Sequence, residues 1–470
     1  MDSNNNSKPD LDQSFRDSVS TVAKDGKRVW IFPLKPKGKF YDYRTWFSYF
    51  CLILLFGLPF VKIDGNPLLL LNIIERKFII FGIVFWPQDF ALFGLAMITF
   101  MVFIVLFTAV FGRLFCGWAC PQTIFMEMVF RKIEYWIEGD MAYQKLLDKM
   151  PWNAEKIRKK TMKYFLFFLV SFIISNTFLA YIIGVDELYK IITEPVSQHI
   201  GGLTAIFLFT GVFYFVYSYM REQVCIVVCP YGRLQGVLLD RNSIVVAYDY
   251  MRGEQRAKFK KNQERTAGDC VDCNLCVKVC PTGIDIRNGT QMECINCTAC
   301  IDACDNMMDA VNLPKGLIRY TSENQIEKKK PFKITSRIIV YSALLLLLLV
   351  GLISALLVRS DVETTILRTA GLMYQEQPNE KISNLYNYKV VNKTFNNKNL
   401  TFKLEDFDGE FRFIGQEQLT LKGQELKEGE FFLIVDKKNI KQRSTKIKIG
   451  VYENGKRIET IKTKFLGKSF

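Results

Sequence analysis

Apolar residues are concentrated in five runs, which are separated by polar or basic connections. Each run is about as long as a helix must be to cross the roughly 30 Å of hydrocarbon in a bilayer. The sequence therefore predicts five transmembrane helices, at residues 46–61, 90–111, 164–183, 203–219 and 338–358. The fifth run is the most uniformly apolar, because it contains six consecutive leucines at 344–349.

A sixth apolar run, residues 68–86, is interrupted near its middle by Glu75, Arg76 and Lys77. Three charged side chains in the middle of a lipid-facing helix would be costly. We therefore interpret this run as an interfacial or re-entrant segment and not as a further span.

The pattern changes after residue 361 to short segments of alternating apolar and polar residues. Examples are residues 386–391, 400–404, 431–435 and 446–452, which are separated by clusters of Asn, Gly and Asp. Short strands at this spacing are typical of an immunoglobulin-like β-sandwich. Residues 359–470 contain no cysteine and no histidine, so we expect a recognition or docking role there and not chemistry.

The predicted organisation is thus an α-helical membrane protein with two water-exposed parts. It comprises an N-terminal tail (1–44), a four-span membrane domain (45–220), a cysteine-rich region (221–337), a fifth transmembrane helix (338–358) and the sandwich (359–470).

Basic residues give the chain a net charge of +15, and their distribution predicts its orientation. Residues 1–44 and 112–163 contain nine and ten Lys or Arg, whereas 62–89 and 184–200 contain three and one. Short connections rich in Lys and Arg stay in the cytoplasm. We therefore predict a multi-pass protein of the bacterial inner membrane, with the N-terminus and region 221–337 cytoplasmic and the sandwich periplasmic. The basic balance then requires no nucleic-acid partner.

Eight of the 13 cysteines form two runs of nearly identical spacing, and the first run ends in Pro281. The spacing C-x2-C-x2-C-x3-C-P is the signature of bacterial two-cluster ferredoxins, in which the fourth cysteine of each run binds the other cluster. The sequence predicts two [4Fe–4S] clusters, one held by Cys270, Cys273, Cys276 and Cys304 and the other by Cys294, Cys297, Cys300 and Cys280. Structural zinc would need only four ligands, and a disulfide framework gives no reason for repeated spacing.

A second repeated motif follows two of the predicted spans. It is Cys-x3-Cys-Pro, with an arginine three or four residues upstream, and its cysteines are Cys116, Cys120, Cys225 and Cys229. Residues four apart share one face of a helix, and a proline disfavours helical angles in the residue before it. Each motif is therefore expected to pair two thiols where a helix ends or kinks. Such thiols can bind soft ions such as Cu(I) or exchange with disulfides, and both options stay open.

The other candidate side chains carry less weight. Cys51 stands alone in the first span, where a buried apolar role is the simplest interpretation. His199 is the only histidine, so a haem with two histidine ligands is excluded. There is no glycine-rich nucleotide fingerprint, so the electron donor is an unknown partner, a quinol or a small reductant.

These motifs together resemble the CcoG family of cytochrome c oxidase accessory proteins, also called FixG or RdxA. The resemblance extends over most of the chain and includes residues 115–123, 229–235, 248–254 and 382–389. It implies an oxidoreductase that reduces Cu(II) to Cu(I) during assembly of a haem–copper oxidase. Cys116, Cys120, Cys225 and Cys229 would contact copper as its catalytic thiols, and the eight ferredoxin cysteines would hold the electron relay.

The implied partners are subunits of the oxidase or a copper chaperone, besides the lipid bilayer; a homodimer is left open. Two rival functions remain at this point. One is a quinol-linked relay of electrons to a periplasmic reductase, for which the sandwich would be the docking module. The other is a non-catalytic scaffold for oxidase assembly, in which the clusters are structural.

Overall fold

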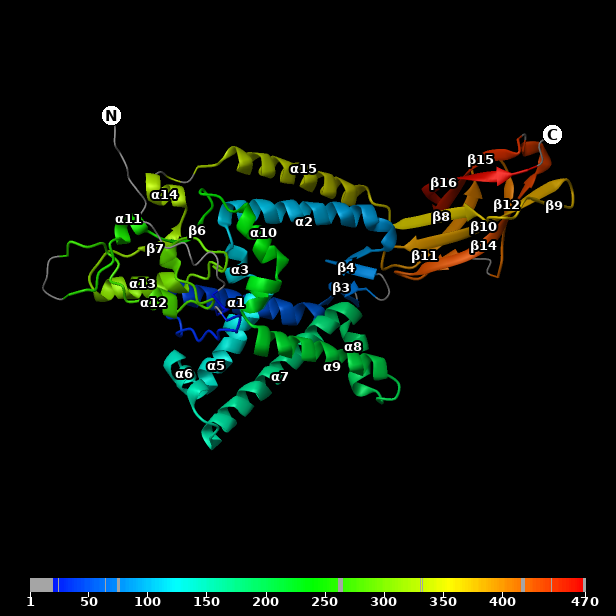
Figure 1. Ribbon diagram of the computed structural model, residues 1–470. Coiled ribbons are helices and arrows are strands. Elements are labelled where there is room, and N and C mark those ends of the chain that lie inside the picture. The colour runs from blue at the N-terminus through cyan, green and yellow to red at the C-terminus, as the bar shows by residue number, and fades with distance from the viewer. Residues whose placement is uncertain are drawn as a thin grey trace, which may run out of the picture. The chain divides into compact units, whose positions relative to one another are not determined.

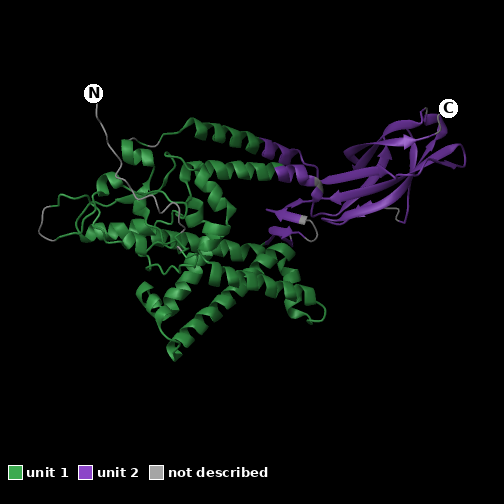
Figure 2. Ribbon diagram, in the orientation of Figure 1, with its two compact units in different colours: residues 1–61, 95–350 green, residues 62–94, 351–470 purple. Residues whose placement is uncertain are grey.

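The computed structural model describes residues 20–467 except for 24, 64, 74–76, 261–264, 330, 332, 416–418 and 441. Residues 1–19, nearly half of the predicted N-terminal tail (1–44), therefore lie outside the described residues. The chain forms two compact units, coloured separately in Figure 2. Unit 1 comprises residues 1–61 and 95–350, and unit 2 comprises residues 62–94 and 351–470.

Five helices in the described residues are long and apolar enough to cross a membrane, as predicted (Figure 1). They are α1 (Lys39–Gly57), α2 (Phe90–Phe111), α7 (Ala154–Ile183), α9 (Ile200–Phe215) and α15 (Ser336–Val358). α9 continues as a π-helical turn, Val216–Met220. α7 and α9 pack together, and the buried hydroxyls of Ser175 and Thr210 lie 2.8 Å apart between them. Small polar residues commonly join helices within membranes in this way.

The first helix begins at Lys39, seven residues before the predicted span. The carboxylate of Asp302 accepts hydrogen bonds from the backbone N–H groups of Phe40 (3.2 Å) and Tyr41 (2.8 Å). It thereby satisfies N–H groups that a helix start leaves without partners. Asp302 comes from a distant part of the chain, which the local apolar pattern could not reveal.

The connections of unit 1 are built from shorter elements. They are α3 (Leu114–Trp118), α4 (Pro121–Thr123), the π-helical η4 (Ile124–Phe130), α5 (Arg131–Ile137), α6 (Met141–Lys149), α8 (Val185–Thr193), the π-helical η6 (Val224–Val228) and α10 (Pro230–Leu238). The cysteine-rich region adds β6 (Val245–Tyr248), α11 (Tyr250–Gly253), α12 (Leu275–Lys278), η7 (Ile286–Asn288), α13 (Ala299–Ala310), β7 (Ile318–Thr321) and α14 (Glu323–Lys328). Strands β6 and β7 pair antiparallel.

Unit 2 contains the predicted β-sandwich. One sheet has the order β12 (Gly409–Phe413), β14 (Leu426–Asp436), β10 (Lys381–Asn392), β8 (Val362–Arg368), with β9 (Gln375–Gln377) also paired to β10. The other has the order β13 (Leu419–Leu421), β11 (Lys398–Leu404), β15 (Ser444–Glu453), β16 (Lys456–Leu466). Alternate residues such as Tyr386, Phe431 and Ile449 are buried in a shared core, as the period-2 pattern predicted.

The interrupted apolar run at 68–86 is a small antiparallel sheet and not a helix. Its strands are β3 (Leu69–Asn72), β4 (Lys77–Ile80) and β5 (Ile83–Phe85), and a two-stranded ladder of β1 (Lys62–Ile63) and β2 (Asn66–Pro67) precedes them. Phe81 and Gly82 form the β4–β5 turn with positive φ angles of 51° and 79°. Glu75 and Arg76 lie outside the described residues, and the interfacial position of the run stays a prediction.

Candidate metal centres

The two ferredoxin-like runs adopt the same backbone conformation. In the first, Asp272 and Asn274 have positive φ angles of 50° and 57°, and Asn296 and Thr298 repeat this at the equivalent positions with 53° and 66°. Left-handed residues alternating with ordinary ones turn successive backbone N–H groups toward one point, and such nests bind anionic groups, iron–sulfur clusters included. The repeated spacing is thus accompanied by repeated geometry.

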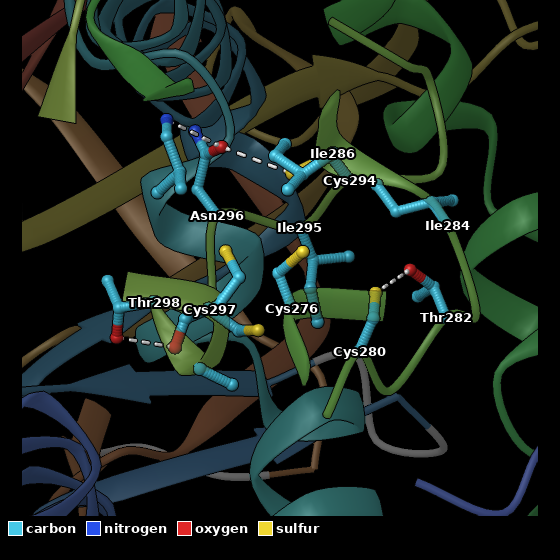
Figure 3. Close-up of a pocket in the computed structure, with 13 residues that line it drawn as sticks. Cys276, Cys280, Thr282, Ile284, Ile286, Cys294, Ile295, Asn296, Cys297 and Thr298 are labelled. Carbon is cyan, nitrogen blue, oxygen red and sulfur yellow. Dashed lines mark hydrogen bonds between the residues drawn. The ribbon is translucent and has the colours of Figure 1, made fainter. Parts of the chain in front are cut away.

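The cysteines of the two runs line two separate pockets. Cys280, from the first run, shares one pocket with Cys294, Cys297 and Cys300, and Figure 3 shows its sulfur beside the Thr282 hydroxyl. Cys304, from the second run, shares the other pocket with Cys270, Cys273 and Cys276. Cys276 borders both pockets. The fourth cysteine of each run therefore lies with the first three of the other, which is the grouping expected of a two-cluster ferredoxin.

The donor set suits two iron–sulfur clusters better than single metal ions. Among the residues that the structure describes, no three His, Cys, Asp or Glu side chains are close enough to hold one ion. A [4Fe–4S] cubane is larger than an ion, so its four ligand sulfurs stand farther apart. Buried apolar side chains, including Ile284, Ile286 and Ile301, pack around the cysteines and would keep water from a cluster.

We call the pocket that contains Cys270, Cys273, Cys276 and Cys304 the first pocket, and the one that contains Cys280, Cys294, Cys297 and Cys300 the second pocket. The buried Arg44 and Arg113 lie near cysteine sulfurs of the second pocket. Burial raises the pKa of Cys294 to about 12 and that of Cys297 to about 11, while the charges of Arg113 and Arg44 act in the opposite direction on these two thiols. In the first pocket, Arg287 stands near Cys276 but is paired with Asp285 and Asp272, each at 2.7 Å. Positively charged side chains therefore stand near cysteines of both pockets.

Each Cys-x3-Cys-Pro motif marks the end of a helix, as predicted. Cys120 has φ −63° and ψ 124°, and Cys229 has φ −70° and ψ 111°, so both are extended. Pro121 and Pro230 then begin the next helices, α4 and α10. The missing N–H of proline costs nothing at a first helical position.

The four thiols of these motifs lie within electrostatic reach of one another. Burial raises the pKa of Cys116 to about 11, and the charges of Cys120 and Cys229 act in the same direction. Burial raises that of Cys225 to about 12, again with contributions from the other three thiols. In the described residues, no three of these thiols are close enough to hold one metal ion. Binding of one copper ion by three or more of them therefore requires the side chains to move closer together.

A buried glutamine connects the two motifs. The Gln235 side-chain oxygen, on α10 after the second motif, accepts hydrogen bonds from Arg113 Nε and Cys116 Sγ of the first, both at 3.1 Å. Gly232, also on α10, lies so close that a Cβ would stand 2.8 Å from the Cys225 carbonyl oxygen and 2.9 Å from Arg113 Nη2. Gln235 ends the stretch 229–235 that carries the family resemblance. A single polar residue on a short helix resembles many surface residues, so its burial was not predicted.

The first motif packs directly on the loop of the second pocket. A side chain on Gly117 would overlap the carbonyl oxygen of Ile295 and come within 2.9 Å of the backbone of Asn296. Trp118 donates to the Tyr320 hydroxyl (3.1 Å), which in turn donates to the Asn296 carbonyl (3.2 Å). Ile295 and Asn296 stand between Cys294 and Cys297, so this thiol motif and these pocket cysteines are neighbours.

A buried ionic network supports the second motif. Arg221 donates two 2.8 Å hydrogen bonds to Glu134, which also lies 3.7 Å from Arg131 and from Lys163. Burial alone would raise the pKa of Glu134, but Arg221, Lys163 and Arg131 outweigh it and hold that pKa at about 2. In the sequence, Arg131 and Lys163 were interpreted only as charges of a cytoplasmic connection. The spacing of Glu127, Arg131 and Glu134 by three and four residues does indicate ion pairs along one helix.

His199 and Cys51 do not join either site. His199 Nε2 lies 2.5 Å from Glu194 in the connection between α8 and α9. Cys51 is half-buried within α1.

Comparison with protein-family models gives three matches. Residues 220–323 match a 4Fe-4S dicluster domain, residues 93–140 a 4Fe-4S binding domain, and residues 352–468 an IG-like fold at the C-terminal of FixG, a putative oxidoreductase. The second match contains only Cys116 and Cys120, which are too few for a cubane by themselves.

Comparison with curated proteins decides the family. The protein RdxB of Cereibacter sphaeroides is 34% identical over 385 residues, which cover 78% of this chain and 80% of that protein. The chain belongs to the FixG/RdxA family. The nitrogen fixation protein FixG of Rhizobium meliloti is 34% identical over 63% of this chain and 58% of its own length.

Two further comparisons show weaker similarity. The putative electron transport protein YccM of Escherichia coli is 26% identical over 41% of this chain and 47% of that protein. A solved FixG-related protein of Vibrio parahaemolyticus aligns over 23% of this chain and 99% of its own, with 17% identity and a TM-score of 0.19, which is too low to support an argument. FixG/RdxA membership and the two iron–sulfur domains make this chain a multi-pass iron–sulfur electron-transfer protein.

Proposed function

We propose that this FixG/RdxA-family protein reduces Cu(II) to Cu(I) for the assembly of a haem–copper cytochrome c oxidase. The observation that carries the proposal is the packing of the first Cys-x3-Cys-Pro motif on the pocket that contains Cys280, Cys294, Cys297 and Cys300. A source of single electrons and a set of soft ligands are thereby placed side by side.

The eight ferredoxin cysteines hold the clusters in the two groups that line the pockets. When bound, the clusters supply single electrons at potentials that nearby charge and hydrogen bonds adjust. Arg44 and Arg113 would favour negative charge on a cluster in the pocket that contains Cys280, and Arg287, paired with Asp285 and Asp272, would do so in the pocket that contains Cys304. The Cys280 group lies beside the first Cys-x3-Cys-Pro motif.

The four thiols Cys116, Cys120, Cys225 and Cys229 receive copper as the substrate. Thiolates prefer Cu(I) to Cu(II), so a sulfur site favours the reduced product. A thiolate pair on Cu(I) carries negative charge, which the buried Arg113 beside Cys116 offsets. Arg113 and Arg221 hold the two motifs in place through Gln235 and Glu134.

The orientation follows from the Lys and Arg distribution. The N-terminus and the clusters lie in the cytoplasm, the sandwich lies in the periplasm, and the protein resides in a bacterial inner membrane. The sandwich contacts an oxidase subunit or a copper chaperone. Because the thiols follow the cytoplasmic ends of α2 and α9, the Cu(I) they release begins its path to the oxidase on the inner side.

Replacing Cys116, Cys120, Cys225 and Cys229 together with serine should abolish copper binding and leave the visible absorbance of the clusters unchanged. The reason is that these four thiols belong to neither of the pockets that the ferredoxin cysteines line. Copper retained after gel filtration and iron content, measured on the same sample, check this. Replacing Cys51 with serine is the matched control. Loss of iron together with copper would mean that the motif is structural.

A further inference from the structure

A small cavity lies beside Cys225, at the start of the second thiol motif. It is lined by Cys225, Thr123, Met126, Glu127, Arg221 and Glu222, and by Pro281, Thr282 and Ile295 from the loops of the second cysteine pocket. Its volume of about 20 Å³ accommodates one water molecule or one ion. An organic molecule such as a quinol does not fit there.

Two sulfur-containing residues line this cavity. Met126 is almost fully buried, with 3% of its surface exposed, and belongs to the π-helical segment Ile124–Phe130. Cys225 belongs to another π-helical segment, Val224–Val228. π-Helical turns are rare and occur frequently at functional sites. Thiolate and thioether sulfur are the side-chain ligands that select Cu(I).

A buried carboxylate also borders the cavity. Glu222 is 5% exposed, and its Oε1 accepts a hydrogen bond of 3.1 Å from Arg28. Its Oε2 has no hydrogen-bond partner among the described residues; Arg221 Nε lies 3.6 Å away. A buried charged oxygen without a hydrogen bond is costly, and a cation in the cavity would remove this cost.

We propose that this cavity is a Cu(I) site in which the Met126 thioether joins the Cys225 thiolate as a second sulfur ligand, with Glu222 as the carboxylate that draws the cation in. The inference rests on the proposed function and adds to it a ligand outside the cysteine motifs. The alternative is that Met126 is only a residue of the hydrophobic core, because it also packs against Phe125 and Tyr217.

The test uses full-length protein with its clusters, in detergent and without oxygen. Cu(I) affinity is measured by competition with a chromogenic Cu(I) chelator for wild type, Met126→Leu and Met128→Leu. Leucine conserves volume, so both variants should fold. Met128 is the matched control, because it is equally buried on the same π-helical segment but does not line the cavity.

We expect Met126→Leu to bind Cu(I) at least about 10-fold more weakly. Even residues that only hydrogen-bond to metal ligands typically change metal affinity by that factor. Met128→Leu should match wild type. Unchanged affinity in Met126→Leu would overturn the inference and leave the proposed function standing. Absence of Cu(I) binding in wild type would overturn both.

A second readout does not depend on the stability of any variant. In selenomethionine-labelled protein, X-ray absorption at the copper edge should show a copper–selenium contact. Absence of this contact in labelled protein that does bind Cu(I) would overturn the inference.

Discussion

Replacing Cys280 with serine should remove the cluster that Cys294, Cys297 and Cys300 hold and leave the other cluster in place. The physical reason is the exchange of fourth cysteines between the two pockets. Iron content and visible absorbance should each fall by about half. Electron delivery to copper should be abolished, because the cluster nearest the thiols is lost.

Double variants separate exchanged ligands from ligands within one run. With exchange, Cys280→Ser and Cys294→Ser act on the same cluster, so the double variant retains about half of the iron. Cys280→Ser combined with Cys270→Ser should lose nearly all of it. The opposite pattern would show that each run holds its own cluster. Cys304→Ser should mirror Cys280→Ser at the other pocket.

Replacing Glu134 with glutamine should destabilise the protein by about 3–5 kcal/mol, because it leaves buried positive charge without its partner. Arg221, Arg131 and Lys163 all face this carboxylate, and each is at most 5% exposed. Thermal unfolding in detergent measures the change. Glu187→Gln is the control: its exposed pair with Lys190 should contribute at most about 1 kcal/mol. Equal effects of the two variants would contradict a supporting role for the network.

The same carboxylate makes stability depend on pH. Its pKa is about 2 in the folded protein, below the ordinary value of 4.5. A lowered folded-state pKa stabilises the protein above the ordinary value, and this contribution is lost as the pH falls from about 4.5 to about 2. The Glu134→Gln variant should lack this part of the acid sensitivity.

Much of the fold was predictable, because it rests on local signals. The five spans required only run length and hydropathy, and the sandwich strands required only alternation, as in β10 and β14. The extended conformation of Cys120 and Cys229 followed from the prolines after them. The family resemblance rested on the same motifs and is confirmed by the relatives.

The rest depends on contacts between distant segments. Asp302 extends α1 from more than 260 residues away, and Gly117 meets Ile295 only in the folded chain. The strands within residues 68–86 were not predicted, because strands and buried helices share short apolar runs. The burial of Gln235 cannot be predicted from any local pattern. The helical spacing of Glu134 and Arg131 indicates an ion pair but does not show that the pair is buried.

The most direct test of the account is a single-turnover reaction without oxygen. The clusters are reduced, excess reductant is removed, and Cu(II) is added while cluster absorbance and Cu(I) formation are recorded together. The account predicts that the clusters are reoxidised as Cu(I) appears, one electron for each ion, and that a variant with serine at 116, 120, 225 and 229 fails to do so. Clusters that stay reduced in the wild type, or a serine variant that reacts equally fast, would contradict it.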